Sequence, residues 1–201
     1  MIITKKNKVY DIEKLVKKIK RALSPSRFAH TIGVTYTAAS LAMRYECDIN
    51  HVMTAGLLHD CAKNMSGDQL IQYCEKNKIS ITETERANNE LLHAKVGSKL
   101  AEKKYGVKDA DILNAILYHT TGKPNMTMIE KIIYVADFIE PGRRELPNIS
   151  VIRKTAFIDI DKAMILILQS TLSYLKSKEI LIDNSTQETY DYYVSTHEEN
   201  I

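Results

Sequence analysis

Apolar residues recur every three or four positions along almost the whole chain, and this spacing limits the fold more than any other feature. Ile12, Leu15, Val16 and Ile19 begin the pattern, which is the period of one face of an α-helix. No stretch alternates apolar and polar residues for long, as a half-buried strand would. The sequence therefore predicts an all-α fold, with at most a minor pair of strands near either terminus.

Capping residues and helix breakers divide this pattern into successive helices. Ser24 followed by Pro25 is typical of a helix start, and Asn50 is expected to cap the third helix. "SGDQ" from Ser66 and "TMIE" from Thr127 have the spacing of capping boxes. The expected helices span about 11–23, 24–45, 50–62, 66–77, 89–105, 110–119 and 127–140, with two more beginning near 161 and 185.

Length and charge indicate a single domain that binds a small molecule. A chain of 201 residues, 44% of them apolar, is long enough for one well-formed core. The net charge of +3 is mild and the lysines are dispersed, so binding to nucleic acid is not expected. A local basic pocket for phosphate groups is compatible with this balance.

Cysteine usage and hydropathy indicate a cytoplasmic protein that does not bind membranes. Cys47, Cys61 and Cys74 are odd in number and form no C-x-x-C pair, which favours neutral thiols in a reducing compartment. The first ten residues lack the apolar core of a signal peptide, and no apolar run is long enough to span a bilayer.

Four of the six histidines lie within or beside apolar stripes. A single inward histidine is more often a core residue with a hydrogen-bond partner than a metal ligand; four of them in one small domain favour a shared site. The other two, His51 and His197, are expected to be solvent-exposed or to cap helices. The four inward histidines are His30, His59, His93 and His119.

Two aspartates are expected to join these histidines. Asp137 follows Ile133 by one helical turn, so its carboxylate points into the core, where an unpaired charge is costly. Asp60 follows His59 directly, about 100° further round a helix, so a metal ion between them can bind both, and the second oxygen of Asp60 can bind another ion. We therefore predict two divalent metal ions, one bound by His30, His59, Asp60 and Asp137 and the other by Asp60, His93 and His119.

Basic and small residues beside these ligands are candidates for binding phosphate, although each could also be an ordinary surface residue or part of a helix stop. Lys63 follows His59 by one helical turn, and Arg27 precedes His30 by three positions, so both can reach phosphate oxygens near the metals. Glycine lets the backbone approach a phosphate closely. The remaining candidates are Thr120, Thr121, Gly122, Arg143 and Arg144.

These residues occur in motifs that resemble the HD-domain metal-dependent phosphohydrolases. The motifs are "RFAHTIGV", "LLHDCAK", "LLHAKVG", "YHTTG" and "YVADFIEPGR". Within the family, the chain most resembles the bacterial YqeK-type branch, the symmetrical diadenosine tetraphosphate hydrolases, over residues 24–175. The resemblance implies an HD-domain helical bundle over 1–201 with its core at about 24–175. The helix at 11–23 and an extension at 183–201 would be appendages.

The resemblance also implies an activity. A two-metal centre, usually of iron, would activate a hydroxide that splits diadenosine tetraphosphate into two molecules of ADP, with Asp60, Lys63 and Arg27 in catalytic roles. Two alternatives stay open: another HD-domain nucleotidase or phosphodiesterase that acts on mononucleotides, and a metal- and nucleotide-binding sensor without turnover. Manganese, cobalt and zinc also suit these ligands. The sequence leaves open the metal, the preferred base and whether the protein forms a homodimer.

Overall fold

Helices make up the regular secondary structure of the part of the chain that the structure describes. The computed structural model describes residues 8–143 and 146–198. Within these ranges there is no strand, so the prediction of an all-α fold is confirmed. The helices are α1 (Ile12–Ala22), α2 (Pro25–Arg44), α3 (Ile49–Leu58), α4 (Gly67–Lys76), α5 (Glu83–Ala87), α6 (Leu92–Lys103), α7 (Ala110–Leu117), α8 (Met128–Ile139), α9 (Ile149–Ala156), α10 (Ile160–Ser177) and α11 (Asn184–Glu198).

Most helix starts follow the predicted caps. The Ser24 side chain accepts a hydrogen bond from the backbone N–H of Arg27, with Pro25 as the first helical residue. Ser66 and Gln69 form the reciprocal contacts of a capping box at the start of α4. These contacts satisfy backbone N–H groups that have no partner within the helix, and so they fix where each helix begins.

The predicted cap of the third helix is wrong. Asp48, and not Asn50, accepts the hydrogen bond that begins α3, from the backbone N–H of His51. Asn50 instead binds the backbone of Tyr10, whose N–H lies 2.7 Å from its Oδ1 and whose carbonyl lies 2.8 Å from its Nδ2. Aspartate and asparagine cap helices equally well, so only the tertiary contact with Tyr10 distinguishes the two.

Several other details differ from the sequence-based expectation. Helix α3 ends at Leu58, and residues 59–64 form turns. His51 is buried, at 7% exposure, and its Nε2 lies 3.3 Å from the carbonyl of Lys8, so the expected exposure of this ring is wrong. Two short helices, α5 and α9, were not expected. The stretch before α6 begins with a 3₁₀ turn over Asn89–Leu91.

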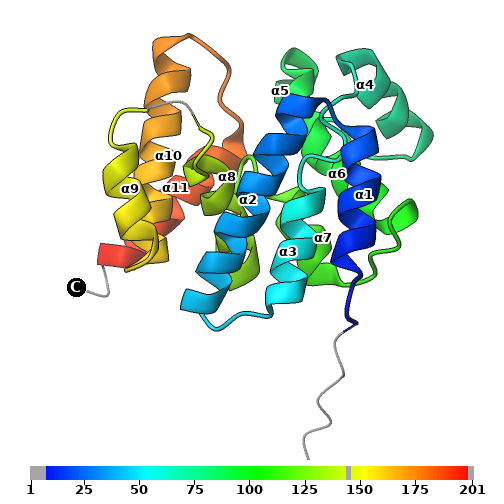
Figure 1. The fold of residues 1–201 in the computed structure, drawn as a ribbon. Coiled ribbons are helices and arrows are strands. Elements are labelled where there is room, and N and C mark those ends of the chain that lie inside the picture. The colour runs from blue at the N-terminus through cyan, green and yellow to red at the C-terminus, as the bar shows by residue number, and fades with distance from the viewer. Residues whose placement is uncertain (1–7, 144–145, 199–201) are drawn as a thin grey trace, which may run out of the picture.

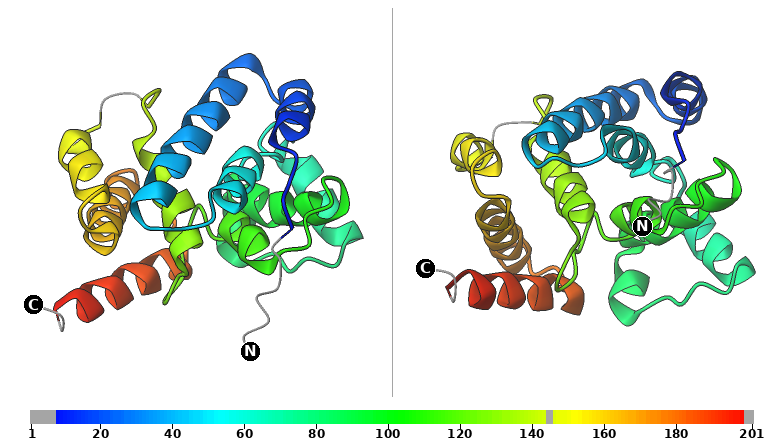
Figure 2. Two further views of the ribbon diagram at one scale, coloured as in Figure 1. Left: turned by 60° about the horizontal axis from the view of Figure 1, so that its bottom comes forward. Right: turned by 90° about the horizontal axis from the view of Figure 1, so that it is seen from below.

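Helix α2 packs against α3 on one side and α8 on the other (Figure 1). Helices α9, α10 and α11 lie beyond α8, whereas α4, α5 and α6 lie on the opposite side of the molecule (Figure 2). Ile133 of α8, Leu58 of α3 and Val34 of α2 are fully buried in the main core. A smaller apolar cluster joins α4 to α6 through Leu70 and Val96. The bundle thus holds α2, α3 and α8 together at its middle.

The three thiols are neutral, as the sequence predicts. Cys47, Cys61 and Cys74 are free, and burial raises the pKa of the Cys61 thiol to about 12. Burial also raises the pKa of Cys47 and of Cys74, so all three are protonated at neutral pH. Among the described residues, none of the helices combines the length and the apolar character that crossing a bilayer requires.

Candidate metal centre

The six residues predicted to bind metal meet at one place near the middle of the bundle. They come from five segments: His30 from α2, His59 and Asp60 just after α3, His93 from the first turn of α6, His119 just after α7, and Asp137 from the last turn of α8. The exposed fraction of His59, Asp60, His93 and His119 is at most 3%. Buried polar side chains need polar partners, and these residues lie within a few ångströms of one another.

Asp60 lies between two pairs of imidazole rings. Its Oδ2 atom lies 3.4 Å from Nε2 of His59 and 3.8 Å from Nε2 of His30. Its Oδ1 atom lies 3.3 Å from Nε2 of His93 and 3.8 Å from Nε2 of His119. The carboxylate therefore faces a different pair of histidines with each oxygen. Two groups of potential metal ligands result, and both contain Asp60.

Asp137 belongs to the first of these groups. Its Oδ1 atom lies 3.0 Å from Nε2 of His30 and 3.9 Å from Nε2 of His59. The arrangement matches the predicted division, in which His30, His59 and Asp137 share one side of Asp60.

The buried histidines turn the same nitrogen towards the cluster. In each of three rings, Nδ1 faces the backbone carbonyl three residues earlier: His59 faces Gly56 at 2.7 Å, His119 faces Ile116 at 2.7 Å, and His93 faces Glu90. A carbonyl can only accept, so Nδ1 carries the hydrogen and the lone pair of Nε2 points inward. This is the tautomer that a metal ion bound at Nε2 requires.

Glu140, which was not predicted as a site residue, accepts the hydrogen of Nδ1 of His30, as the backbone carbonyls do for the other three rings. Its Oε1 atom lies 3.0 Å from Nδ1 of His30, and its Oε2 atom accepts a hydrogen bond of 2.6 Å from the backbone N–H of Gly142. Glu140 is 2% exposed. A Cβ atom added to Gly33 of α2 would collide with the Glu140 carboxylate. The available signal was the spacing, since Glu140 follows Asp137 by three positions and is the C-cap residue at which α8 ends.

Burial and neighbouring charges shift the pKa values of three cluster residues. Burial disfavours the charged form of Asp60, but His59 and His93 hold its pKa well below the usual range. Burial, His93 and His59 together lower the pKa of His119 to about 3, so this ring is neutral at pH 7. His59 differs, because Asp60 raises its pKa against the opposing effect of burial. Without a metal, the raised pKa favours the protonated form of His59, whose positive charge would balance the Asp60 carboxylate.

These residues fit divalent metal ions. Among the described residues, the buried Nε2 atoms of His30 and His59 form no hydrogen bond, although Asp137 Oδ1 lies 3.0 and 3.9 Å from them. Nε2 of His93 lies 3.1 Å from Nε2 of His119, although the Nδ1 contacts give each of these atoms a lone pair. Facing lone pairs repel unless a cation lies near both. Imidazole nitrogens with carboxylate oxygens form the donor set that first-row divalent metals prefer.

Three of the predicted phosphate-binding residues lie at the edge of the cluster. Arg27 Nη1 lies 2.9 Å from Asp60 Oδ2, and Arg143 Nη2 lies 2.7 Å from Asp137 Oδ1. Lys63 Nζ lies 3.4 Å from Nδ1 of His93. Each side chain is partly exposed, at 33%, 35% and 22% respectively. Arg144 lies outside the described residues.

The turn after His119 was predicted to bind phosphate, but in the structure it packs against helix α11. Gly122 is buried and has a φ of +68°, and a Cβ atom on it would lie 2.8 Å from the Cγ2 atom of Thr189 in α11. The hydroxyl of Thr189 lies 3.3 Å from the carbonyl of Thr121. Thr121 and Gly122 thus pack against α11. A phosphate-binding role for Thr120, Thr121 and Gly122 stays a prediction.

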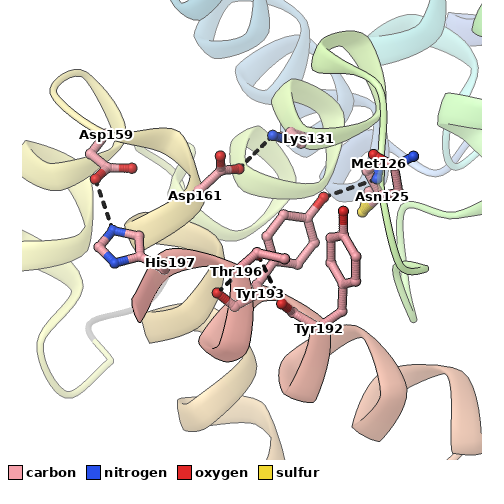
Figure 3. A pocket seen from close by; sticks show the side chains of 9 residues that line it. All are labelled: Asn125, Met126, Lys131, Asp159, Asp161, Tyr192, Tyr193, Thr196 and His197. Carbon is pink, nitrogen blue, oxygen red and sulfur yellow. Dashed lines mark hydrogen bonds and ion pairs between the residues drawn. The ribbon is translucent and has the colours of Figure 1, made fainter. Parts of the chain in front are cut away.

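Two hollows open beside the cluster and share Ser26 and Arg27. One, of about 490 Å³, reaches Lys63 and His93, and the other, of about 390 Å³, reaches His30 and Arg143. A further hollow of about 420 Å³ lies under α11 and is lined by none of the six cluster residues (Figure 3).

Comparison with known proteins identifies the family. Residues 27–142 match the HD domain. The chain is 39% identical over 177 residues to the symmetrical bis(5'-nucleosyl)-tetraphosphatase of Bacillus subtilis, covering 88% of this chain and 94% of that protein. The protein of the same name from Staphylococcus aureus is 35% identical over 185 residues, covering 91% and 94%.

A solved structure agrees with this result. It is described as a predicted HD superfamily hydrolase involved in NAD metabolism from Clostridium acetobutylicum, is 37% identical, and superimposes with a TM-score of 0.89 over 94% of this chain and all of that one. The chain therefore belongs to the HD-domain family, in the group that includes the bacterial proteins named symmetrical bis(5'-nucleosyl)-tetraphosphatase.

Proposed function

We propose that the protein is a metal-dependent phosphohydrolase that cleaves diadenosine tetraphosphate symmetrically into two molecules of ADP. The observation that carries this proposal is the position of Asp60, each of whose oxygens faces a separate pair of histidines. Three relatives that are 35–39% identical to this chain are named for this activity.

The proposed metal centre holds two divalent ions, for which iron is our first choice and manganese, cobalt and zinc are the alternatives. Bound there, such ions would acidify a water molecule and neutralise phosphate oxygens. His30, His59, Asp60 and Asp137 would hold one ion, and Asp60, His93 and His119 the other. Glu140 and the three backbone carbonyls would keep each Nε2 free of hydrogen and directed inward.

Basic side chains at the edge of the cluster would hold the polyphosphate. The contact of Arg27 with Asp60 uses one N–H of its guanidinium group, which leaves other N–H groups to donate to phosphate oxygens. Lys63 and Arg143 offer further positive charge on either side of Arg27. Thr120, Thr121 and Gly122, and Arg144, remain weaker candidates for the same role.

The two hollows beside the cluster suit a substrate that is cut in its middle. Each reaches one of the two histidine groups, and Arg27 lines both. A chain of four phosphates that crosses the cluster would place one nucleoside diphosphate in each hollow and the central bond near Asp60. The departing diphosphate is a stable anion, so the reaction needs no strong general acid.

The test is to supply metal ions to the purified protein, incubate it with diadenosine tetraphosphate and separate the nucleotides by chromatography. ADP as the sole product supports the proposal. ATP with AMP would mean asymmetric cleavage. Phosphate release from mononucleotides without action on the dinucleotide would favour the nucleotidase alternative, and binding without turnover would favour a sensor. An Asp60→Asn variant controls for contaminating hydrolases.

A further inference from the structure

Helix α11 covers the segment that follows His119. Thr189 and Tyr193 of this helix are buried, at 0% and 3% exposure, and both face the loop between α7 and α8. Figure 3 shows the Tyr193 ring reaching from α11 towards Asn125 and Met126 of that loop. The C-terminal helix therefore contacts the ten-residue loop, 118–127, that contains His119.

Tyr193 holds the far end of this loop. Its hydroxyl oxygen accepts a hydrogen bond of 3.0 Å from the backbone N–H of Met126, which is itself buried at 4% exposure. A buried N–H without an acceptor costs about 1–3 kcal/mol, so this contact favours one path of the loop. Lys131 lies 5.4 Å from the centre of the Tyr193 ring and 2.5 Å from Asp161 of α10, which keeps the tyrosine in place.

Thr189 contacts the start of the same loop, next to His119. Its hydroxyl lies 2.5 Å from the carbonyl of Ser185 and 3.3 Å from that of Thr121. Its methyl group occupies the space beside Gly122 where any other residue would carry a Cβ atom. The N–H of Gly122 donates to the carbonyl of Tyr118 at 2.9 Å, and this bond closes the turn that contains His119.

His119 is consequently held from two directions. On its N-terminal side, Nδ1 is fixed by the carbonyl of Ile116 in α7, and on its C-terminal side the turn is pressed against α11. We infer that α11 positions the His119 ring for metal binding, with Thr189 and Tyr193 as the positioning residues. This inference rests on the proposed function, because it takes His119 as a metal ligand.

The experiment compares Tyr193→Phe with a matched control, Tyr10→Phe. The hydroxyl of Tyr10 also accepts a hydrogen bond from a backbone N–H, that of Lys108 at 3.3 Å, and Tyr10 is also buried. It contacts the start of α3, at the opposite end of that helix from His59. Both variants lose one hydroxyl that accepts from the backbone, so a general loss of stability would appear in both.

Two readouts are needed, and neither depends on turnover. The first is manganese affinity, measured by titration of the metal-free protein. We expect Tyr193→Phe to bind one of the two ions about tenfold more weakly, with the other ion unchanged, whereas Tyr10→Phe binds both as the wild type does. The second is hydrogen exchange of the Gly122 amide in the metal-free protein, which should become faster in Tyr193→Phe only.

Thr189→Val, which keeps the shape and removes the hydroxyl, should give a smaller change in the same direction. Equal manganese affinity in the two tyrosine variants would overturn the inference. If the wild type bound no metal, the proposed function would fail, and the exchange of Gly122 would still decide whether α11 holds the His119 turn: unchanged exchange in Tyr193→Phe refutes it.

Discussion

Nδ1 of His30 and Oε1 of Glu140 lie 3.0 Å apart, although 110 positions separate them in the chain. The contact joins α2 to the end of α8, and it decides which nitrogen of His30 faces the metal-binding cluster. Arg153 of α9 stabilises the end of α8 by donating hydrogen bonds to the backbone carbonyls of Ile139 and Glu140. The geometry of one predicted ligand thus depends on a carboxylate that does not itself face the cluster.

Replacing Glu140 by glutamine should weaken metal binding without unfolding the protein. The amide keeps the size of the carboxylate and one acceptor, but it removes the charge that makes His30 a stronger donor to metal. We expect a 10- to 100-fold loss of affinity, measured by manganese titration of the metal-free variant. Glu102→Gln, which alters a surface contact with Lys99, is the control and should behave as the wild type. Equal affinity in the two variants would contradict the role of Glu140.

Gly33→Ala should reverse the usual effect of this substitution. In most helices alanine is more stable than glycine by about 1 kcal/mol, but here the added Cβ atom would collide with the buried Glu140 carboxylate. We expect a lower free energy of unfolding in urea and weaker metal binding. Gly97→Ala in α6 is the comparison, since its Cβ atom would meet its neighbours no closer than 3.4 Å. A stabilised Gly33→Ala variant would show that Glu140 moves aside freely.

Asp60→Asn should remove both metal ions together. The amide keeps the shape of the side chain, but one carboxylate oxygen and the negative charge are lost, and each oxygen faces a different pair of histidines. Elemental analysis should find neither ion, and hydrolysis should fall at least a thousandfold, or about 4 kcal/mol in transition-state stabilisation. Circular dichroism should remain helical. Retention of one ion at full occupancy would rule out the bridging position.

Lys63→Ala should lower turnover or substrate affinity while metal content stays the same. Lys63 borders the larger hollow beside the cluster, and its proposed partner is phosphate. We expect a 10- to 100-fold loss in kcat/KM, about 1.4–2.7 kcal/mol. Lys17→Ala on the exposed face of α1 is the control for the loss of a positive charge. Loss of metal from the Lys63 variant would instead assign this residue to the metal centre.

Metal binding should release a proton and weaken as the pH falls. Burial alone would lower the pKa of His59, but the Asp60 carboxylate raises it above its ordinary value. Below this raised pKa, His59 holds a proton that the metal must displace, so affinity falls with decreasing pH. Calorimetry at about pH 6, near the ordinary histidine pKa, should give heats that depend on the ionisation enthalpy of the buffer. Identical heats in all buffers would exclude the displaced proton.

The meeting of the six cluster residues could be predicted from the sequence because each lies on, or directly after, a helix whose apolar face has to point to the core. His93 and His119 lie on or beside such apolar faces, and a polar residue at such a position needs a partner wherever the helix packs. The contact between Glu140 and His30 could not be predicted in this way, because it depends on how α8 crosses α2. The choice between Asp48 and Asn50 as a cap likewise depended on Tyr10, forty positions away.

Helix ends of opposite partial charge border the cluster and the hollow beside it. Helices α3, α7 and α8 all end beside the cluster, so their carbonyl ends, which carry partial negative charge, favour cations there. The larger hollow beside Lys63 is bordered instead by the starts of α2 and α4, at Ser24 and Ser66, whose N–H groups favour anions. The helix ends therefore add to the effect of the charged side chains, because they favour metal ions at the cluster and phosphates in the adjoining hollow.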